Sequence, residues 1–231
     1  MLAIRPAAER GHANHGWLDS NFSFSFDQYY DPAHMGFHAL RVINEDRVAP
    51  GTGFGKHPHR DMEILTYVLE GAVKHEDSTG SSETLVPGEL QHMSAGTGVL
   101  HSEMNPSGAE TLHLLQIWLL PNQLGIPPKY EQKRFTVQDE PNQLHLLASS
   151  DAHDGSFKIY SDAELLAAKL DAGGSVSHTF KLGNGWLQVA RGTVSVAGGT
   201  LQAGDGLALE HESSITIASD TGAEFLLFDL A

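Results

Sequence analysis

Two short stretches of the sequence carry side chains that can bind a metal ion. His57-Pro-His59 places two histidines two positions apart, and His101-Ser-Glu103 repeats that spacing with a histidine and a glutamate. In an extended strand, residues i and i+2 project to the same face. If the two strands line facing walls of a small barrel, three imidazoles and one carboxylate converge on one point. The sequence therefore predicts one metal site made by these four side chains.

Such a ligand set points to reactive chemistry and not to a structural ion. Three imidazoles and one carboxylate leave two positions open on an octahedral ion, much as the facial triad of non-haem iron oxygenases does. A closed four-coordinate zinc site without thiolates would be unusual. The open positions suit a substrate or dioxygen. A divalent ion lowers the pKa of a bound hydroxyl, and Glu103 can act both as a ligand and as the local catalytic base.

The segments around both stretches have the pattern of β-strands. Residues 63–70 are rich in β-prone side chains, and residues 112–120 form a long apolar run typical of a strand buried on both faces. Turn-forming residues recur about every 8–12 positions, and no stretch before residue 121 has a 3.6-residue period. These observations predict an all-β sandwich or barrel. The glycine-rich turn at residues 50–55 lacks the ending of a phosphate-binding loop.

Three further segments carry weaker signals. Residues 22–26 alternate Phe and Ser, which predicts a strand with one buried face. Residues 162–170 are the one short helical candidate. His12 and His15 lie in a stretch rich in Gly and Asn, where we expect hydrogen-bonded loop histidines and not additional metal ligands.

An internal repeat indicates a duplicated barrel. Residues 67–73 can be laid on residues 188–194, and residues 85–89 match residues 201–205 in the same order. The first match carries His57 onto His178 but His59 onto Phe180. The positions of the second pair fall near residues 216–219, where no ligand type occurs. We therefore expect a metal-binding barrel at residues 1–130 and a degenerate barrel without metal at residues 131–231.

Composition narrows the function classes. The formal net charge is -15 and the acidic residues are spread along the chain, which disfavours direct binding of nucleic acid. The absence of cysteine excludes disulfides, thiolate metal sites and cysteine nucleophiles. No apolar run approaches the roughly 20 residues that span a bilayer, and residues 1–11 contain no apolar signal segment. We expect a cytoplasmic protein that contacts no membrane, and we expect a monomer.

The motifs resemble those of the cupin superfamily. The cupin pattern G-x5-H-x-H matches Gly51, His57 and His59, and the pattern G-x2-H-x3-N matches Gly98, His101 and Asn105. More narrowly, the segments at residues 10–20, 24–32, 57–71 and 94–106 resemble the pirin family. The resemblance is strong from about residue 5 to 130 and weak beyond. Glu63 is spaced differently from the acid of the general cupin motif, and the pirin pattern places the carboxylate ligand at Glu103.

The pirin resemblance implies a bicupin fold and an activity. Bacterial pirin-like proteins have quercetin 2,3-dioxygenase activity, in which dioxygen opens the heterocycle of a flavonol and carbon monoxide is released. The implied cofactor is one divalent ion, Fe(II) in the first instance, with Mn, Ni, Co or Zn as alternatives. The implied partners are a flavonol or similar polyphenol and O2. Phe54, Met93 and Gln116 are our candidates for the substrate pocket, although each is equally typical of an ordinary core or rim position.

Two alternatives remain open. Pirin itself is an iron protein that modulates transcription factors by protein contact, so the chain could be a redox-sensing regulator. A cavity of about 300 Å³ or more above the ion would favour the enzyme. A cupin isomerase acting on a sugar or keto acid is less expected, because only Lys56 and Arg60 supply cationic side chains near the ligands in sequence.

Overall fold

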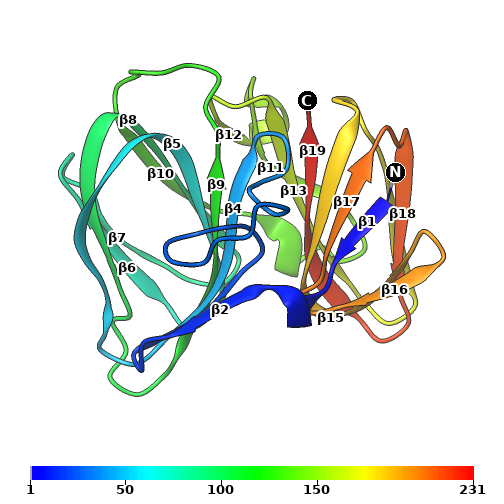
Figure 1. The fold of residues 1–231 in the computed structure, drawn as a ribbon, viewed down its shortest axis with the longest axis horizontal. Helices are drawn as coiled ribbons and strands as arrows, with labels where there is room; N and C mark the ends of the chain where they lie inside the picture. The colour runs from blue at the N-terminus through cyan, green and yellow to red at the C-terminus, as the bar shows by residue number, and fades with distance from the viewer. Residues whose placement is uncertain (1) are drawn as a thin grey trace. The chain divides into compact units, whose positions relative to one another are not determined.

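The computed structural model describes residues 2–231 and consists almost entirely of antiparallel strands. It divides into two compact units. The N-terminal barrel comprises residues 11–36 and 40–134, and the C-terminal barrel comprises residues 2–10, 37–39 and 135–231. The two-barrel, all-β architecture predicted from turn spacing and from the repeat is confirmed (Figure 1). No helix within residues 2–231 is long and apolar enough to cross a membrane.

The N-terminal barrel is one continuous sheet of nine strands. Their order across the sheet is β2-β3-β4-β9-β5-β8-β6-β7. Strand β10 also pairs with β8, at residues 89–94. The bounds are β2 (Gly11–Asn14), β3 (Leu18–Phe22), β4 (Leu40–Val48), β5 (Gly53–Glu70), β6 (Val73–Asp77), β7 (Ser82–Leu85), β8 (Glu89–Met104), β9 (Leu112–Leu119) and β10 (Lys129–Arg134).

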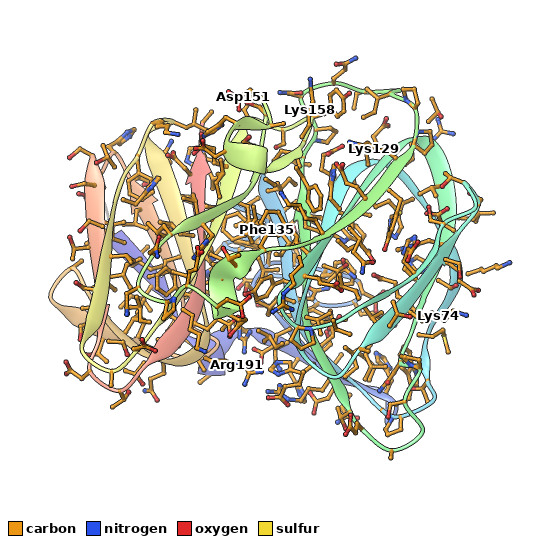
Figure 2. All side chains as sticks on the ribbon, turned by 180° about the vertical axis from the view of Figure 1, so that it is seen from behind. Lys74, Lys129, Phe135, Asp151, Lys158 and Arg191 are labelled. Carbon is orange, nitrogen blue, oxygen red and sulfur yellow. The ribbon has the colours of Figure 1, made fainter. Side chains whose placement is uncertain are left out.

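The C-terminal barrel takes its first strand from the start of the chain. Strand β1 pairs antiparallel with β17, with Leu2 opposite Leu209 and Arg5 opposite Gly206. The bounds are β1 (Leu2–Arg5), η1 (Ala7–Glu9), η2 (Thr136–Gln138), β11 (His145–Ser149), η3 (His153–Gly155), β12 (Phe157–Lys158), β13 (Ala163–Leu170), β14 (Gly174–Thr179), β15 (Asn184–Val196), β16 (Gly199–Gln202), β17 (Gly206–Glu210), β18 (Ser214–Ser219) and β19 (Ala223–Leu230). Apolar side chains fill its interior, and charged ones such as Lys158 and Arg191 lie outside (Figure 2).

Two expected elements are absent. The helix predicted at residues 162–170 is wrong: β13 is a strand between β11 and β19, with nearly every side chain buried. The strand predicted at residues 22–26 is also wrong beyond its first residue, because β3 ends at Phe22 and a tight turn bridges Phe26 to Tyr29. Phe22 and Phe24 are buried, but Ser23 and Ser25 between them are buried as well and Phe26 is only half-buried, so the alternation does not mark one buried face.

The long strands β5 and β8 pair with each other and fold back on themselves as a ribbon (Figure 1). Gln91 and Glu103 are 12 positions apart on β8, which is about 40 Å in a straight strand. Their side chains are nevertheless 3.3 Å apart. The two halves of the ribbon therefore form facing walls of one barrel, and the bend lies between them at Gly96.

A bulge at the bend decides which residues face the barrel interior. The pairing of β5 with β8 shifts register between His59 and Asp61, and Asp61 has a φ of +63°. Before the shift, His57 and His59 line the interior cavity, and after it Ile64 does so. The inward-facing residues thus change from odd-numbered positions at His57 and His59 to even-numbered positions after the bulge, since successive side chains on a strand alternate between faces.

Replacing Gly96 with alanine is expected to destabilise the fold. Gly96 has a φ of +47°, and an added Cβ would overlap the carbonyl group of Ile126. We expect the free energy of unfolding to fall by about 2–4 kcal/mol, since both backbone strain and overpacking oppose the change. Urea denaturation measures it. Gly108→Ala is the control, because no atom lies within 4 Å of the added Cβ there; equal stability of the two variants would contradict the expectation.

A buried ionic cluster lies on the face of β5 opposite to Ile64. His92 Nε2 is 2.7 Å from Glu63 Oε2, and His92 Nδ1 is 2.9 Å from Glu131 Oε1. Burial alone would lower the pKa of His92, but the two carboxylates outweigh burial and raise that pKa. His92 therefore links three strands as a positively charged imidazolium.

The His92 cluster predicts a pH-dependent stability. A histidine whose pKa is raised on folding stabilises the folded state fully below about pH 6.5, and the contribution is lost as pH rises through the folded-state pKa. His92→Leu should lower the free energy of unfolding by about 3 kcal/mol at pH 6, because it removes the imidazole that contacts the carboxylates of Glu63 and Glu131 in a buried site. The difference from wild type should narrow towards pH 9. A difference that grows with pH in denaturant titrations would rule this assignment out.

Candidate metal centre

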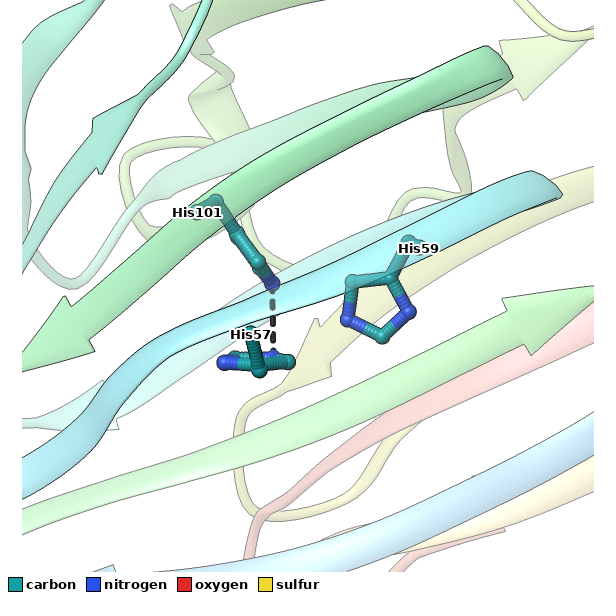
Figure 3. Close-up of side chains that lie close together, drawn as sticks. All are labelled: His57, His59 and His101. Carbon is teal, nitrogen blue, oxygen red and sulfur yellow. Dashed lines mark hydrogen bonds between the residues drawn. The ribbon is translucent and has the colours of Figure 1, made fainter.

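Three imidazoles converge at one end of the N-terminal barrel (Figure 3). His57 on β5 and His101 on β8 are direct cross-strand partners, and their Nε2 atoms are 3.0 Å apart. His59 completes the group, and the ligand atoms of all three lie within 4.8 Å of one another. The expected i, i+2 projection is confirmed, but the two stretches are neighbours on one wall and do not face each other across the barrel.

The three histidines fit a divalent ion. Two nitrogens that bind one ion at about 2.1 Å and at right angles lie about 3 Å apart, as in the His57–His101 pair. His57 Nδ1 donates to the carbonyl of Gly55 at 2.8 Å, which leaves Nε2 as the free lone pair. Burial lowers the pKa of His59 to about 4 and that of His101 to about 3, and the neighbouring imidazoles add to the effect. Both rings are therefore neutral at pH 7, which is the form in which an imidazole can bind a metal ion.

Glu103 is held across the barrel. Its Oε2 accepts a hydrogen bond of 2.8 Å from the Gln116 amide, and its Oε1 lies 3.2 Å from Thr66 Oγ1 and 3.3 Å from Gln91 Nε2. Glu103 forms a second group of possible ligands with His101 and His75. Its carboxylate thus groups with His101 but not with His57 and His59, so the structure does not bring the four expected ligands into one group. Hydrogen bonds from Thr66, Gln91 and Gln116 fix its orientation.

His75 contacts His101 at its Nδ1 atom, and we did not identify this residue from the sequence. His75 Nε2 lies 2.9 Å from Asp77 Oδ2, and His75 Nδ1 lies 3.5 Å from His101 Nδ1. Burial would raise the pKa of Asp77, but hydrogen bonds from His75 and Thr79 lower it to about 2. These partners assign one protonation pattern: His101 donates to His75, and His75 donates to Asp77. The His101 Nε2 lone pair is then directed at the cavity.

The sequence did contain a signal for this chain of contacts. His75 and Asp77 have the same i, i+2 spacing as the two pairs of candidate metal ligands, and they lie on the short strand β6. Tyr130 stacks on the His75 ring at a centroid distance of 4.3 Å and covers it.

Replacing His75 with phenylalanine tests this role. The variant keeps a ring against Tyr130 but removes both hydrogen bonds, so His101 loses the partner that orients it. We expect metal affinity to fall about 10- to 100-fold, as is typical when the partner of a ligating histidine is lost. Competition of Zn2+ against a chromophoric chelator measures the affinity. Glu76→Gln on the same strand is the control; an unchanged affinity in His75→Phe would exclude an orienting role.

The histidines open into a cavity of about 640 Å³. Of the three residues that we selected for the pocket, Phe54 and Gln116 line this cavity. Met93 is buried and packs with Ile64, Ala95 and Val99, and it is not among the residues that line the cavity. His15, which we interpreted as a loop histidine, does line it.

The cavity also has a polar side that no motif signals. Ser20 on β3 and Asp46 on β4 are cross-strand partners, and the Ser20 hydroxyl donates to an Asp46 carboxylate oxygen. Burial raises the pKa of Asp46 to about 7. Asn44 lies two positions earlier on the same strand and also lines the cavity. Its sequence context, Asn-Glu-Asp-Arg, is typical of a solvated strand end, so pattern reasoning had no reason to place it inside.

Family models match both halves of the chain. A model described as Pirin matches residues 3–119, and a model described as Quercetinase C-terminal cupin domain matches residues 146–230. The two matches correspond to the duplicated barrel inferred from the internal repeat.

Full-length relatives are similar in sequence and structure. A quercetin 2,3-dioxygenase of Escherichia coli (strain K12) is 53% identical over 231 residues, which are 100% of this chain and 99% of the relative. A solved bacterial pirin from Escherichia coli in complex with nickel(II) is 52% identical with a TM-score of 0.94, covering 100% of this chain and 99% of that one. A quercetin 2,3-dioxygenase structure from Acinetobacter baumannii, at 21% identity and a TM-score of 0.77, covers 98% and 84% and supports the fold alone.

Proposed function

The chain belongs to the pirin family and is a cupin metalloenzyme, and from this we propose that it acts as a quercetin 2,3-dioxygenase. In the proposed reaction both atoms of dioxygen enter the product, the heterocycle of the flavonol opens, and one ring carbon leaves as carbon monoxide. The single observation that carries the proposal is the cluster of His57, His59 and His101 at the wall of a cavity of about 640 Å³. That volume is in the range that holds a three-ring ligand.

The residues of the cavity have different roles in the proposed reaction. A divalent ion held by the three histidines would lower the pKa of the flavonol 3-hydroxyl. Glu103 would take the released proton, because its carboxylate lies beside His101 and is oriented by Gln116. The Trp118 ring packs edge-on against His59 at 5.0 Å and lines the cavity, where it supplies an apolar wall for the substrate and displaces water.

One divalent ion is the implied cofactor, and we propose Fe(II) as its identity in this chain. Three imidazoles and a carboxylate suit Fe(II), Mn(II), Ni(II), Co(II) and Zn(II) alike, so the ligands alone do not select among these ions. The nickel(II) complex of the Escherichia coli pirin is a precedent for one of the alternatives.

The C-terminal barrel is proposed to carry no ion. Within residues 2–231, both groups of side chains close enough to hold a metal lie in the N-terminal barrel. His178, the counterpart of His57 in the repeat, lies 3.0 Å from Asp229 Oδ2 and serves as a structural partner. Its other contact is with the ring of Phe180, the counterpart of His59.

Oxygen consumption with quercetin tests the proposal. The protein is loaded separately with Fe(II), Mn(II), Ni(II), Co(II) and Zn(II), and uptake is recorded together with carbon monoxide release. Metal-dependent uptake with one carbon monoxide per dioxygen is the expected result, and it names the competent ion. Absence of uptake in every fully loaded sample would overturn the proposal and favour the regulatory alternative.

A further inference from the structure

Two polar atoms in the cavity wall lack hydrogen-bond partners. The Asn44 amide oxygen and the Trp118 indole nitrogen are both buried, and neither has a partner within residues 2–231. Buried polar groups in folded proteins are normally paired with protein or water, so each unpaired one requires an explanation. Both residues line the cavity of about 640 Å³. One atom is an acceptor and the other is a donor.

The register of the sheet places these groups close to the metal centre. Asn44 on β4 is the cross-strand partner of Gln116 on β9, and the Gln116 amide donates to Glu103. Adjacent strands are about 4.8 Å apart, so Asn44 lies one strand beyond the residue that holds Glu103. Asp46 follows on the same face of β4, with its carboxylate buried and held by Ser20.

The walls around this polar group are aromatic. Trp17, Phe22, Phe26 and Phe54 line the same cavity, and Trp17 packs edge-on against Phe54 at a centroid distance of 5.2 Å. Flat apolar walls with a few convergent polar atoms are typical of sites for aromatic small molecules. A ligand that fills this space has to bring its own hydrogen-bonding groups to Asn44 and Trp118, or leave these two unpaired.

We propose that Asn44, Asp46 and Trp118 form a subsite that binds a phenolic hydroxyl of the substrate other than the hydroxyl held at the metal centre. A hydroxyl both donates and accepts, so it matches an unpaired amide oxygen and an unpaired indole N–H. A methoxy group cannot donate, and a bare ring can do neither. The substrate class is therefore a polyhydroxylated aromatic compound, and not a flavonol with the 3-hydroxyl alone. This inference rests on the proposed function and specifies its substrate.

The test compares two ligands that share the metal-binding end. Quercetin carries four hydroxyls besides its 3-hydroxyl, and 3-hydroxyflavone carries none. Binding to the zinc-loaded protein without dioxygen is followed by quenching of tryptophan fluorescence, because two tryptophans line the cavity. Wild type should bind quercetin at least about tenfold more tightly, as expected when an extra ligand hydroxyl satisfies buried polar atoms. In Asn44→Leu and Asp46→Leu the affinity for quercetin should exceed the affinity for 3-hydroxyflavone by no more than about threefold. The affinity for 3-hydroxyflavone itself should be nearly unchanged.

Three further variants make the result decisive. Trp118→Phe keeps the aromatic wall and removes only the N–H, and it should lower the ratio as Asn44→Leu does. Asp46→Asn keeps a polar group and should retain much of the ratio, which covers the case in which the leucine variant does not fold. Glu45→Gln is the matched control, because Glu45 lies on β4 but pairs with His113 on the other face.

Two outcomes would overturn the subsite. Equal affinity of wild type for both ligands would show that no remote hydroxyl is recognised. An equal loss of affinity for quercetin and for 3-hydroxyflavone in the Asn44 and Asp46 variants would show that these residues act at the metal-binding end instead. Neither outcome depends on turnover, so failure of the subsite and failure of the dioxygenase proposal are separately visible.

Discussion

Replacing His101 with alanine is expected to abolish both metal binding and turnover. His101 is the central ligand: its Nε2 faces His57 at 3.0 Å, its Nδ1 faces His75, and it belongs to both groups of possible ligands. Loss of an orienting partner already lowers metal affinity about 10- to 100-fold, so loss of the ligand itself should exceed a hundredfold. We expect metal content after dialysis to fall from about one ion per chain to below about one tenth.

The measurement is elemental analysis of the dialysed protein together with oxygen uptake. His113→Gln is the matched control, since His113 is a buried histidine of the same barrel that pairs with Glu45 and lies outside both ligand groups. It should keep its ion. A His101→Ala protein that retains one tightly bound ion would remove His101 from the ligand set and with it the basis of the proposed site.

The second large effect is expected at Glu103. In Glu103→Gln the three histidines can still hold the ion, but the amide cannot take a proton from the substrate. Proton transfer by a positioned side chain contributes about 10²- to 10⁴-fold to rate, so turnover should fall by that factor while metal content changes little. The amide also places an N–H group where Gln116 and Gln91 donate, which disturbs the orientation of the side chain.

Steady-state kinetics with quercetin at matched metal content separate the two roles of Glu103. Glu89→Gln, on the same strand and outside both ligand groups, is the control. Lost turnover with the ion retained supports Glu103 as the base. Loss of the ion would make Glu103 chiefly a ligand, and unchanged turnover with the ion bound would exclude it from the chemistry.

The convergence of His57, His59 and His101 was predictable because strand geometry is local. The i, i+2 spacing of His57 and His59, and of His101 and Glu103, decides which face the side chains share without any knowledge of distant contacts. The spacing could not show on which wall of the barrel each pair lies. The antiparallel pairing of β5 with β8 places His57 opposite His101 and makes the two pairs neighbours, and this long-range pairing cannot be read from the spacing.

The error at residues 162–170 has a physical cause. The segment Asp-Ala-Glu-Leu-Leu-Ala-Ala-Lys-Leu is composed of strong helix formers, and propensity is a weak influence compared with burial. In the structure β13 pairs along its whole length with β19 and is buried on both faces. Pairing with residues 223–230 is a long-range contact, and such contacts leave no trace in local composition.

The polar side of the cavity could not be predicted from the sequence, for a different reason. Asn44 and Asp46 belong to no motif, and they alternate in the sequence with the charged residues Glu45 and Arg47. Only the register of β4 against β3 and β9 brings them inside the barrel. His75 and Asp77 were detectable in principle, because they repeat the spacing of the ligands, but that spacing alone does not place them behind His101.

The pairing of β1 with β17 has a consequence for how the chain is made. Residues 2–5 leave the ribosome about 200 residues before their partners at residues 206–209. The N-terminal barrel can close once residue 134 has left the ribosome, whereas the C-terminal barrel stays incomplete until residues 135–231 have emerged. During that interval β1 is an unpaired strand with exposed Leu2 and Ile4, the kind of edge that invites association between nascent chains. Shortening the N-terminus should therefore damage the barrel made last and spare the barrel made first.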